Sequence, residues 1–209
     1  EGVGKLDGAW DASGAPSHPV LAMAAINAAL ETGLPSALDD AILAANGTHA
    51  AGCRKLAEIP FDFVRKRVSV IIEDAEGIRL IAKGAFSHVL EDCSSFTDGT
   101  ALDDDRRAAL QALYDGWSSQ GVRVLAVADC VMPRQESYHR DDERDLRFAG
   151  FLTFLDSPKE GAAEAIAALA TLGVQVKLIT GDGKLVSQHV ARLVGLPADQ
   201  VLTGAELNE

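Results

Sequence analysis

Apolar and polar positions predict a hairpin in the first half of the chain. Residues 68–72 are β-branched and apolar apart from Ser69, and residues 78–82 form a second short run of similar character. The segment between them, residues 73–77, is acidic and ends in glycine. Two such runs with a glycine-containing connection indicate paired antiparallel strands, although a connection of this length leaves their register open.

Helical periodicity surrounds this hairpin on both sides. Segments with apolar residues three and four positions apart predict helices at 19–30, 38–43, 85–93 and 106–120. Residues 121–128 are apolar except for the charged Arg123, and this run predicts a buried strand. The first part of the chain therefore mixes helices and strands, with at most one short strand expected in residues 1–19.

The character of the sequence changes after residue 133. Residues 133–147 are mostly charged, which is typical of a loop or an interdomain connection, so we place a domain boundary close to Phe148. The following pattern predicts, in order, a strand, a helix, a strand and a helix at 151–155, 160–172, 174–180 and 184–194. These lengths predict a parallel sheet with a right-handed crossover. The expected domains are residues 1–148 and 149–209.

Composition narrows the classes of partner. The chain has 209 residues, a formal net charge of -12 and no lysine-rich block, which argues against a nucleic-acid partner. Its three cysteines and five histidines are widely spaced, so we expect reduced thiols and no metal site. The sequence has no run of about 18 apolar residues, so we expect no membrane span in it.

Aromatic, cationic and glycine residues gather around the predicted hairpin. Phe61 and Phe63 precede the first strand together with the basic residues 65–67, and Lys83-Gly84 follows the second strand. An aromatic ring can stack on a base, lysine can meet phosphate charge, and glycine lets a ligand approach the backbone. Alternatively, the two rings alternate as half-buried core residues of a strand, and the basic residues protect a strand edge. The residues alone leave both interpretations open.

The wider motif favours the first interpretation. The sequence Pro-Phe-Asp-Phe at 60–63, the basic triplet with Val-Ser-Val, and Lys-Gly-Ala at 83–85 resemble the nucleotide-binding domain of P-type ATPases. The form of the motif is most similar to the bacterial magnesium-transporting branch. The resemblance implies that Phe61 stacks on adenine and that Lys83 and Gly84 line the same pocket. Ser87 departs from the acidic residue that many members carry at that place.

Two further residues are candidates for the nucleotide site. Asp39 follows Ser36 by three residues, so helix capping is enough to explain it, whereas the resemblance places an acid near the adenine amino group. Arg123 is a lone cation in an apolar run, which is costly unless it is paired or faces a ligand. A salt bridge and a phosphate contact explain Arg123 equally well from the residues, and the resemblance implies the phosphate contact.

The second part of the chain carries two short motifs. Asp156-Ser157-Pro158-Lys159 and Thr180-Gly181-Asp182 each follow a predicted strand, and open α/β sheets bind ligands at the carboxyl ends of their strands. Both resemble motifs of the P-type ATPase phosphorylation domain, which has a haloacid-dehalogenase-like fold. The resemblance implies catalytic roles for Asp156, Lys159, Thr180, Gly181 and Asp182 toward the phosphoryl group and magnesium.

The phosphorylated aspartate of the family lies in a DKTGT motif, which this sequence lacks. We therefore expect an α+β nucleotide-binding domain, with an antiparallel sheet flanked by helices, followed by part of an α/β haloacid-dehalogenase-like domain. Such a fragment should bind ATP with Mg²⁺ but not turn it over. The resemblance further implies the cytoplasmic part of a magnesium transporter of a bacterial inner membrane, with the remaining phosphorylation, actuator and membrane domains as partners.

Two other functions fit less well. A free-standing regulatory nucleotide-binding module would leave half of an α/β domain with an unpaired sheet edge. A haloacid-dehalogenase-type phosphatase with a large cap would need an Asp-x-Asp nucleophile motif near its N-terminus, which the sequence lacks.

Overall fold

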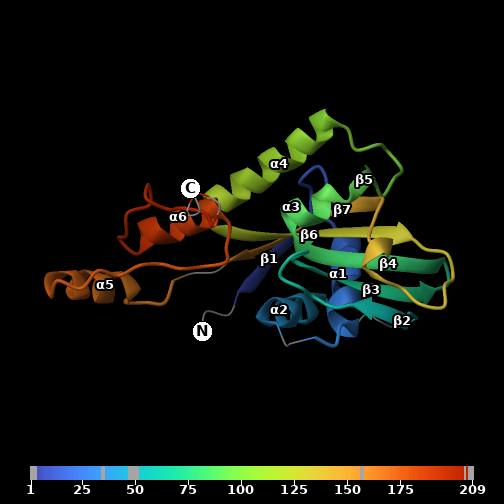
Figure 1. The fold of residues 1–209 in the computed structure, drawn as a ribbon, viewed down its shortest axis with the longest axis horizontal. Coiled ribbons are helices and arrows are strands. Elements are labelled where there is room, and N and C mark those ends of the chain that lie inside the picture. Colours follow the sequence, from blue (N-terminus) through green and yellow to red (C-terminus); the bar gives the residue numbers. More distant parts are fainter. Residues whose placement is uncertain (1–3, 34–35, 47–51, 156–157, 205, 207–209) are drawn as a thin grey trace.

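The computed structural model describes residues 4–33, 36–46, 52–155, 158–204 and 206. Within them, seven strands form one twisted sheet in the order β1-β7-β6-β4-β3-β2, with β5 paired beside β7 (Figure 1). The strands are β1 Lys5–Asp11, β2 Arg54–Ile59, β3 Arg67–Asp74, β4 Gly77–Ala85, β5 Cys93–Phe96, β6 Val122–Val131 and β7 Leu146–Leu155. All pairs are antiparallel except β5 with β7. The predicted antiparallel sheet is confirmed.

Helices cover both faces of the sheet. The α-helices of the described residues are α1 His18–Leu30, α2 Ala37–Asn46, α3 Phe86–Glu91, α4 Asp104–Ser119, α5 Ala162–Thr171 and α6 Lys184–Leu193. A 3-10 turn, η1 Arg140–Asp142, precedes β7. α1 and α2 pack on the face that carries Val70, Ile81 and Leu152. α3 and α4 pack on the opposite face, against residues such as Leu80 and Phe148. The four helices predicted in the first part of the chain are therefore present.

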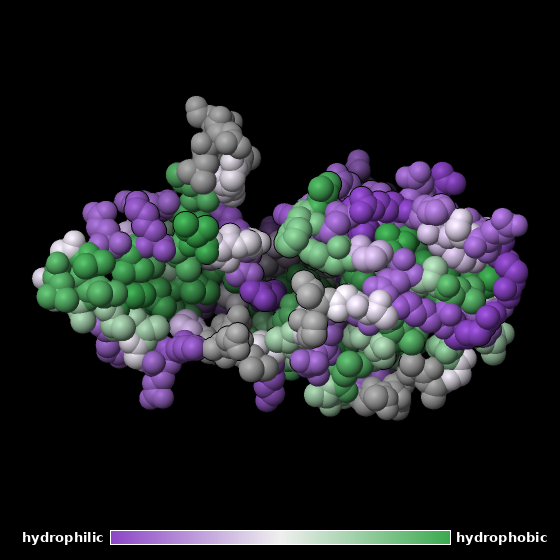
Figure 2. Space-filling view, turned by 60° about the horizontal axis from the view of Figure 1, so that its bottom comes forward, coloured by the Kyte–Doolittle hydropathy of each residue, from purple (hydrophilic) through white to green (hydrophobic). Residues whose placement is uncertain are grey.

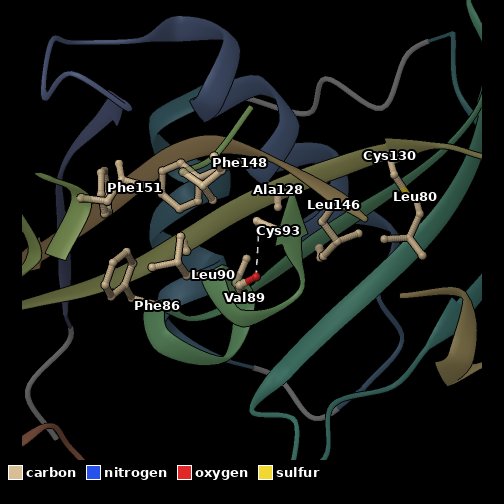
Figure 3. Packing of buried hydrophobic residues seen from close by; sticks show 14 of the residues in the cluster. Leu80, Phe86, Val89, Leu90, Cys93, Ala128, Cys130, Leu146, Phe148 and Phe151 are labelled. Atoms are coloured by element: carbon tan, nitrogen blue, oxygen red, sulfur yellow. Dashed lines mark hydrogen bonds between the residues drawn. The ribbon is translucent and has the colours of Figure 1, made fainter. Parts of the chain in front are cut away.

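The core on the α3 and α4 side is rich in aromatic rings. Phe86 lies 5.6 Å from Phe151 and 6.3 Å from Phe148 between ring centroids (Figure 3). Cys93 is buried in the same cluster and donates to the Val89 carbonyl at 3.2 Å. Burial raises the pKa of Cys93 to about 12, so this thiol stays protonated and unreactive. All three cysteines are free, as expected.

The central hairpin is formed by β3 and β4 in continuous register from Arg67 opposite Gly84 to Asp74 opposite Gly77. Two residues connect the strands, and Gly77 adopts φ +124°, which residues with a side chain rarely do. The alternating burial is lost in β3, whose first six residues are all buried. Helices on both faces account for this, because a strand covered on both sides presents no solvent face.

The predicted domain boundary at Phe148 falls inside β7. This strand pairs with β6 over most of its length, and its end reaches Lys5 of β1, which lies opposite Leu155. Residues 149–155 therefore belong to the first sheet instead of opening a second one. The apolar run at 151–155 could not reveal this, because parallel and antiparallel buried strands have the same hydrophobic pattern.

The described residues that follow β7 do not form the expected second sheet. Residues 174–180, predicted as a parallel strand, have no strand assignment. α6 packs against α4, whereas α5 has no buried residue and extends away from the sheet (Figure 1). Hydrophobic residues gather at this end of the molecule (Figure 2), including the exposed Leu172 and Ile179. Residues 151–155 are already paired within β7. Among the described residues, the segment 174–180 therefore has no parallel strand to pair with, which explains why the predicted strand is not formed.

Candidate functional site

The hairpin brings the two predicted nucleotide motifs to one end of the sheet. Residues 60–66 connect β2 to the start of β3, where Val68 lies opposite Lys83 and Arg67 opposite Gly84. The Lys66 carbonyl also accepts a hydrogen bond from the Ala85 amide at 2.9 Å. The aromatic loop and the Lys-Gly-Ala segment, distant in sequence, are therefore neighbours.

Phe61 projects from this loop with its ring uncovered. It is 53% exposed, and its neighbour Phe63 is 88% exposed. The two rings meet edge to face at 5.6 Å between centroids. Phe63 is therefore not a core residue, whereas Phe61 is about half exposed, and its exposed part is accessible to a planar ligand.

The backbone of the loop is tightly held. Asp62 accepts hydrogen bonds from the amides of Val64 at 2.9 Å and Arg65 at 2.7 Å, and from Arg65 Nε at 2.6 Å. These bonds, led by the one from the Arg65 amide, lower the pKa of Asp62 to about 2. Lys66 closes the turn with a left-handed backbone at φ +47°. Asp62 is therefore ionised at neutral pH, where its carboxylate binds the loop backbone and Arg65.

Lys83 is buried instead of reaching into solvent. Its side chain is 4% exposed; it donates to the Asp39 carboxylate and lies 3.7 Å from Glu31. Burial, followed by a hydrogen bond with Asp39, raises the pKa of Glu31 to about 7, and the Lys83 charge opposes this rise. The structure therefore brings Asp39 and Lys83 together, as a buried ion pair between α2 and β4.

Asp39 does not act mainly as a helix cap. The Ser36 hydroxyl accepts a hydrogen bond from the Leu38 amide at 3.2 Å, so Ser36 caps α2 as predicted. The Asp39 carboxylate is instead turned toward Lys83. Any contact of Asp39 with adenine stays a prediction.

Gly84 is explained by the neighbouring strand. A Cβ atom at this position would lie 2.4 Å from the Arg67 Cβ and 2.5 Å from the Lys66 carbonyl oxygen. Both distances are far below van der Waals contact, so glycine is needed for β3 to approach β4. The expected close approach of a ligand to Gly84 is thus not required to explain the glycine.

Arg123 meets the second phosphorylation motif. Its guanidinium lies 2.6 Å from the Asp182 carboxylate, whose other oxygen accepts a hydrogen bond from the Thr180 hydroxyl at 2.8 Å. The salt bridge considered for Arg123 is therefore present, and it brings Arg123, Thr180 and Asp182 together. Gly181 lies in open space between them, with no atom within 4 Å of an added Cβ.

Strand geometry relates Arg123 to Lys83. Val127 lies opposite Lys83, and Arg123 is four residues earlier on β6, about 13 Å along the strand at ~3.3 Å per residue. Alternation of side chains puts Arg123 on the sheet face of Val127 and Lys83. That separation suits a ligand with a base at one end and phosphates at the other.

Of the two remaining predicted catalytic residues, the structure describes only Lys159. Lys159 is exposed before α5, and its carbonyl accepts from the Ala162 amide at 3.1 Å. Asp156 lies outside the described residues.

Sequence reasoning missed a buried ionic network behind the aromatic loop. Glu143, from the segment interpreted as a solvated connection, has a fully buried side chain and binds Arg65, Arg67 and Ser69. Arg67 also binds Asp92 and the His88 carbonyl. A single glutamate within a run of charges gives no signal of burial, so pattern alone could not single it out.

An open groove lies where β2 enters the aromatic loop, at Pro60. Its volume is about 400 Å³, and its walls are Glu58, Ile59, Pro60, Tyr138, His139, Arg140 and Asp141. Phe61, Lys83, Asp39 and Arg123 do not line it. Among the described residues, no three His, Cys, Asp or Glu side chains are grouped for metal binding, and no helix is long and apolar enough to cross a membrane.

Comparison with known proteins assigns most of the chain. Residues 13–161 match the family model "P-type ATPase, cytoplasmic domain N". The chain is 40% identical over 214 aligned positions to "Magnesium-transporting ATPase, P-type 1" of Salmonella typhimurium and to its Escherichia coli counterpart, covering 97% of this chain and 24% of each relative. It is 34% identical over 161 positions to "Calcium-transporting ATPase 1" of Lactococcus lactis, covering 74% of this chain and 18% of the relative. The chain thus spans about a quarter of the length of its magnesium-transporting relatives.

Proposed function

Because the chain belongs to the P-type ATPases, we propose that it binds ATP through the loop at residues 60–66 and presents the nucleotide to an aspartate outside this chain. The single observation that carries the proposal is the exposed Phe61 ring on an anchored loop, next to the Lys83 segment. Stacking on a base needs an accessible aromatic ring, and Phe61 is 53% exposed.

The polar groups divide between the two ends of the nucleotide. Lys83, Asp39 and Glu31 form a buried polar cluster next to the start of β3, and this cluster would bind the polar edge of adenine. Arg123 would face the phosphates about 13 Å away along β6. Its present partner Asp182 belongs to the Thr-Gly-Asp motif, so the same arginine would link nucleotide and phosphorylation motif.

The aspartate that accepts the phosphoryl group would lie outside this chain. Phosphoryl transfer to an aspartate depends on positioning and on stabilising the charge of the transferred group. Thr180, Gly181, Asp182, Asp156 and Lys159 would contribute to a phosphorylation site that the rest of the polypeptide completes. Mg²⁺ bound with ATP would offset the charge of the phosphates.

The parent protein would couple this chemistry to ion movement across a bacterial inner membrane. Formation and loss of the aspartyl phosphate would bias its membrane helices between two states. Magnesium is the proposed transported ion, and it rests on the similarity to magnesium-transporting relatives.

Calorimetry with ADP and with AMP-PNP tests the binding role of the chain itself. We expect the adenine end to dominate binding, so the two nucleotides should bind with similar and weak affinity. A strong magnesium-dependent preference for AMP-PNP would show that the phosphate end dominates. The absence of binding to either nucleotide would overturn the proposed function.

A further inference from the structure

Glu143 is a buried carboxylate with partners on both oxygens. Its side chain has no exposed area. One oxygen accepts from Arg65 Nη1 at 2.5 Å and from Arg67 Nε at 3.1 Å, and the other accepts from the Ser69 hydroxyl at 2.5 Å. A buried charge is costly unless it is paired and hydrogen-bonded. Glu143 therefore fixes three groups at the junction of the aromatic loop and β3.

Arg65 carries this restraint to the residues beside Phe61. Its Nη2 donates to the Pro60 carbonyl at 2.5 Å, and its Nε donates to Asp62 at 2.6 Å. Pro60 and Asp62 are the immediate neighbours of Phe61 in the chain. One guanidinium thus binds the backbone carbonyl before Phe61 and the side-chain carboxylate after it, and Glu143 holds that guanidinium from the protein interior.

The Phe61 side chain lies at the surface. More than half of its surface is exposed, and the ring contact recorded for it is with Phe63, which is even more exposed. Its direction is therefore set by the backbone of the loop. A loop ordered before binding loses less conformational entropy when it binds a ligand.

We propose that Glu143 is a positioning residue for the nucleotide, holding Phe61 ready to stack through Arg65 without touching the ligand itself. This inference rests on the proposed function, and specifically on Phe61 as the stacking residue. Without the Glu143 charge, Arg65 loses its interior anchor and the loop must be ordered during binding. The nucleotide dissociation constant should rise about three- to tenfold.

The test uses Glu143→Gln in the 209-residue chain, which keeps the shape of the side chain and removes its charge. ADP affinity is measured by calorimetry in two backgrounds, with Phe61 present and with Phe61→Ala. Because Glu143 acts through the ring, its substitution should weaken binding in the first background and change nothing in the second.

Asp129→Asn is the matched control. Asp129, on β6, is another buried carboxylate, 2% exposed and bound twice by Arg147 at 2.9 and 2.6 Å. This variant should lower the melting temperature by a similar amount and leave ADP affinity unchanged. Should Glu143→Gln not fold, Arg65→Lys replaces it, because lysine keeps the charge but cannot bind Pro60, Asp62 and Glu143 together.

The results separate this inference from the proposed function. Unchanged affinity in Glu143→Gln, with Phe61→Ala clearly weaker, overturns only the inference. Equal weakening in both backgrounds, or equal weakening by Asp129→Asn, also overturns it. Unchanged affinity in Phe61→Ala overturns the stacking role, and the inference with it.

Discussion

Replacement of Lys83 by methionine tests the buried polar cluster most severely. Lys83 is 4% exposed and stands between Asp39 and Glu31, whose side chains are only 12% and 13% exposed. Removing it leaves two carboxylates close together without their cation. Breaking a buried ion pair in this way costs about 3–5 kcal/mol, which is a large part of the ~5–15 kcal/mol that stabilises a typical domain.

The loss should depend on pH in a definite direction. The pKa of Glu31 is raised from 4.5 to about 7, chiefly by burial, and removal of the Lys83 charge should raise it further. A carboxyl group with a raised pKa contributes stability that is fully present below pH 4.5 and is lost as the pH rises through 7. The destabilisation by Lys83→Met should therefore be smaller at pH 5, where Glu31 is protonated, than at pH 8.

Urea unfolding of the wild type and Lys83→Met at pH 5 and pH 8 measures both effects. Lys83→Met/Asp39→Asn serves as the control, because it removes one of the two stranded charges and should recover much of the stability. A loss below about 1 kcal/mol at both pH values would mean that the pair is not buried as described. A larger loss at pH 5 than at pH 8 would refute the assignment of the raised pKa to Glu31.

Three further results are expected. Phe61→Ala should weaken ADP binding by ~1–3 kcal/mol because it removes the stacking face, whereas Phe63→Ala should change the dissociation constant less than about threefold; equal effects in calorimetry would argue against a special role for Phe61. Gly84→Ala should lower the melting temperature strongly, because its Cβ would overlap Arg67 and Lys66, and an unchanged melting temperature would show that the strands can separate there. Glu31→Gln should flatten the pH dependence of the unfolding free energy between pH 4.5 and 7, and a slope as steep as that of the wild type would place the titrating group elsewhere.

Much of the fold was predictable because local patterns determine it. The β3–β4 hairpin, the buried strand β6 and the helices α1 to α4 follow from periodicity and turn residues. The parallel α/β arrangement predicted for the second part was not found in the described residues. Strand direction depends on which distant strand is available as a partner, and here β7 pairs with β6 and β1.

The sequence predicted the residues of the candidate site that belong to a recognisable motif, but not the contacts that depend on the tertiary structure. Phe61 and Lys83 were found from the motif, and the structure places their segments side by side. The pairing of Lys83 with Asp39 and of Arg123 with Asp182 depends on contacts between residues 44 and 59 positions apart. Glu143 could not be distinguished from the charged residues around it, because burial is a property of the tertiary structure.

Chemical-shift mapping of the labelled chain with ADP tests the location of the nucleotide most directly. Stacking on Phe61 should give the largest amide shifts at residues 60–66 and 82–85, with smaller shifts near Arg123. Shifts confined to the groove around Tyr138 and Arg140, or absent from the aromatic loop, would contradict the proposed site.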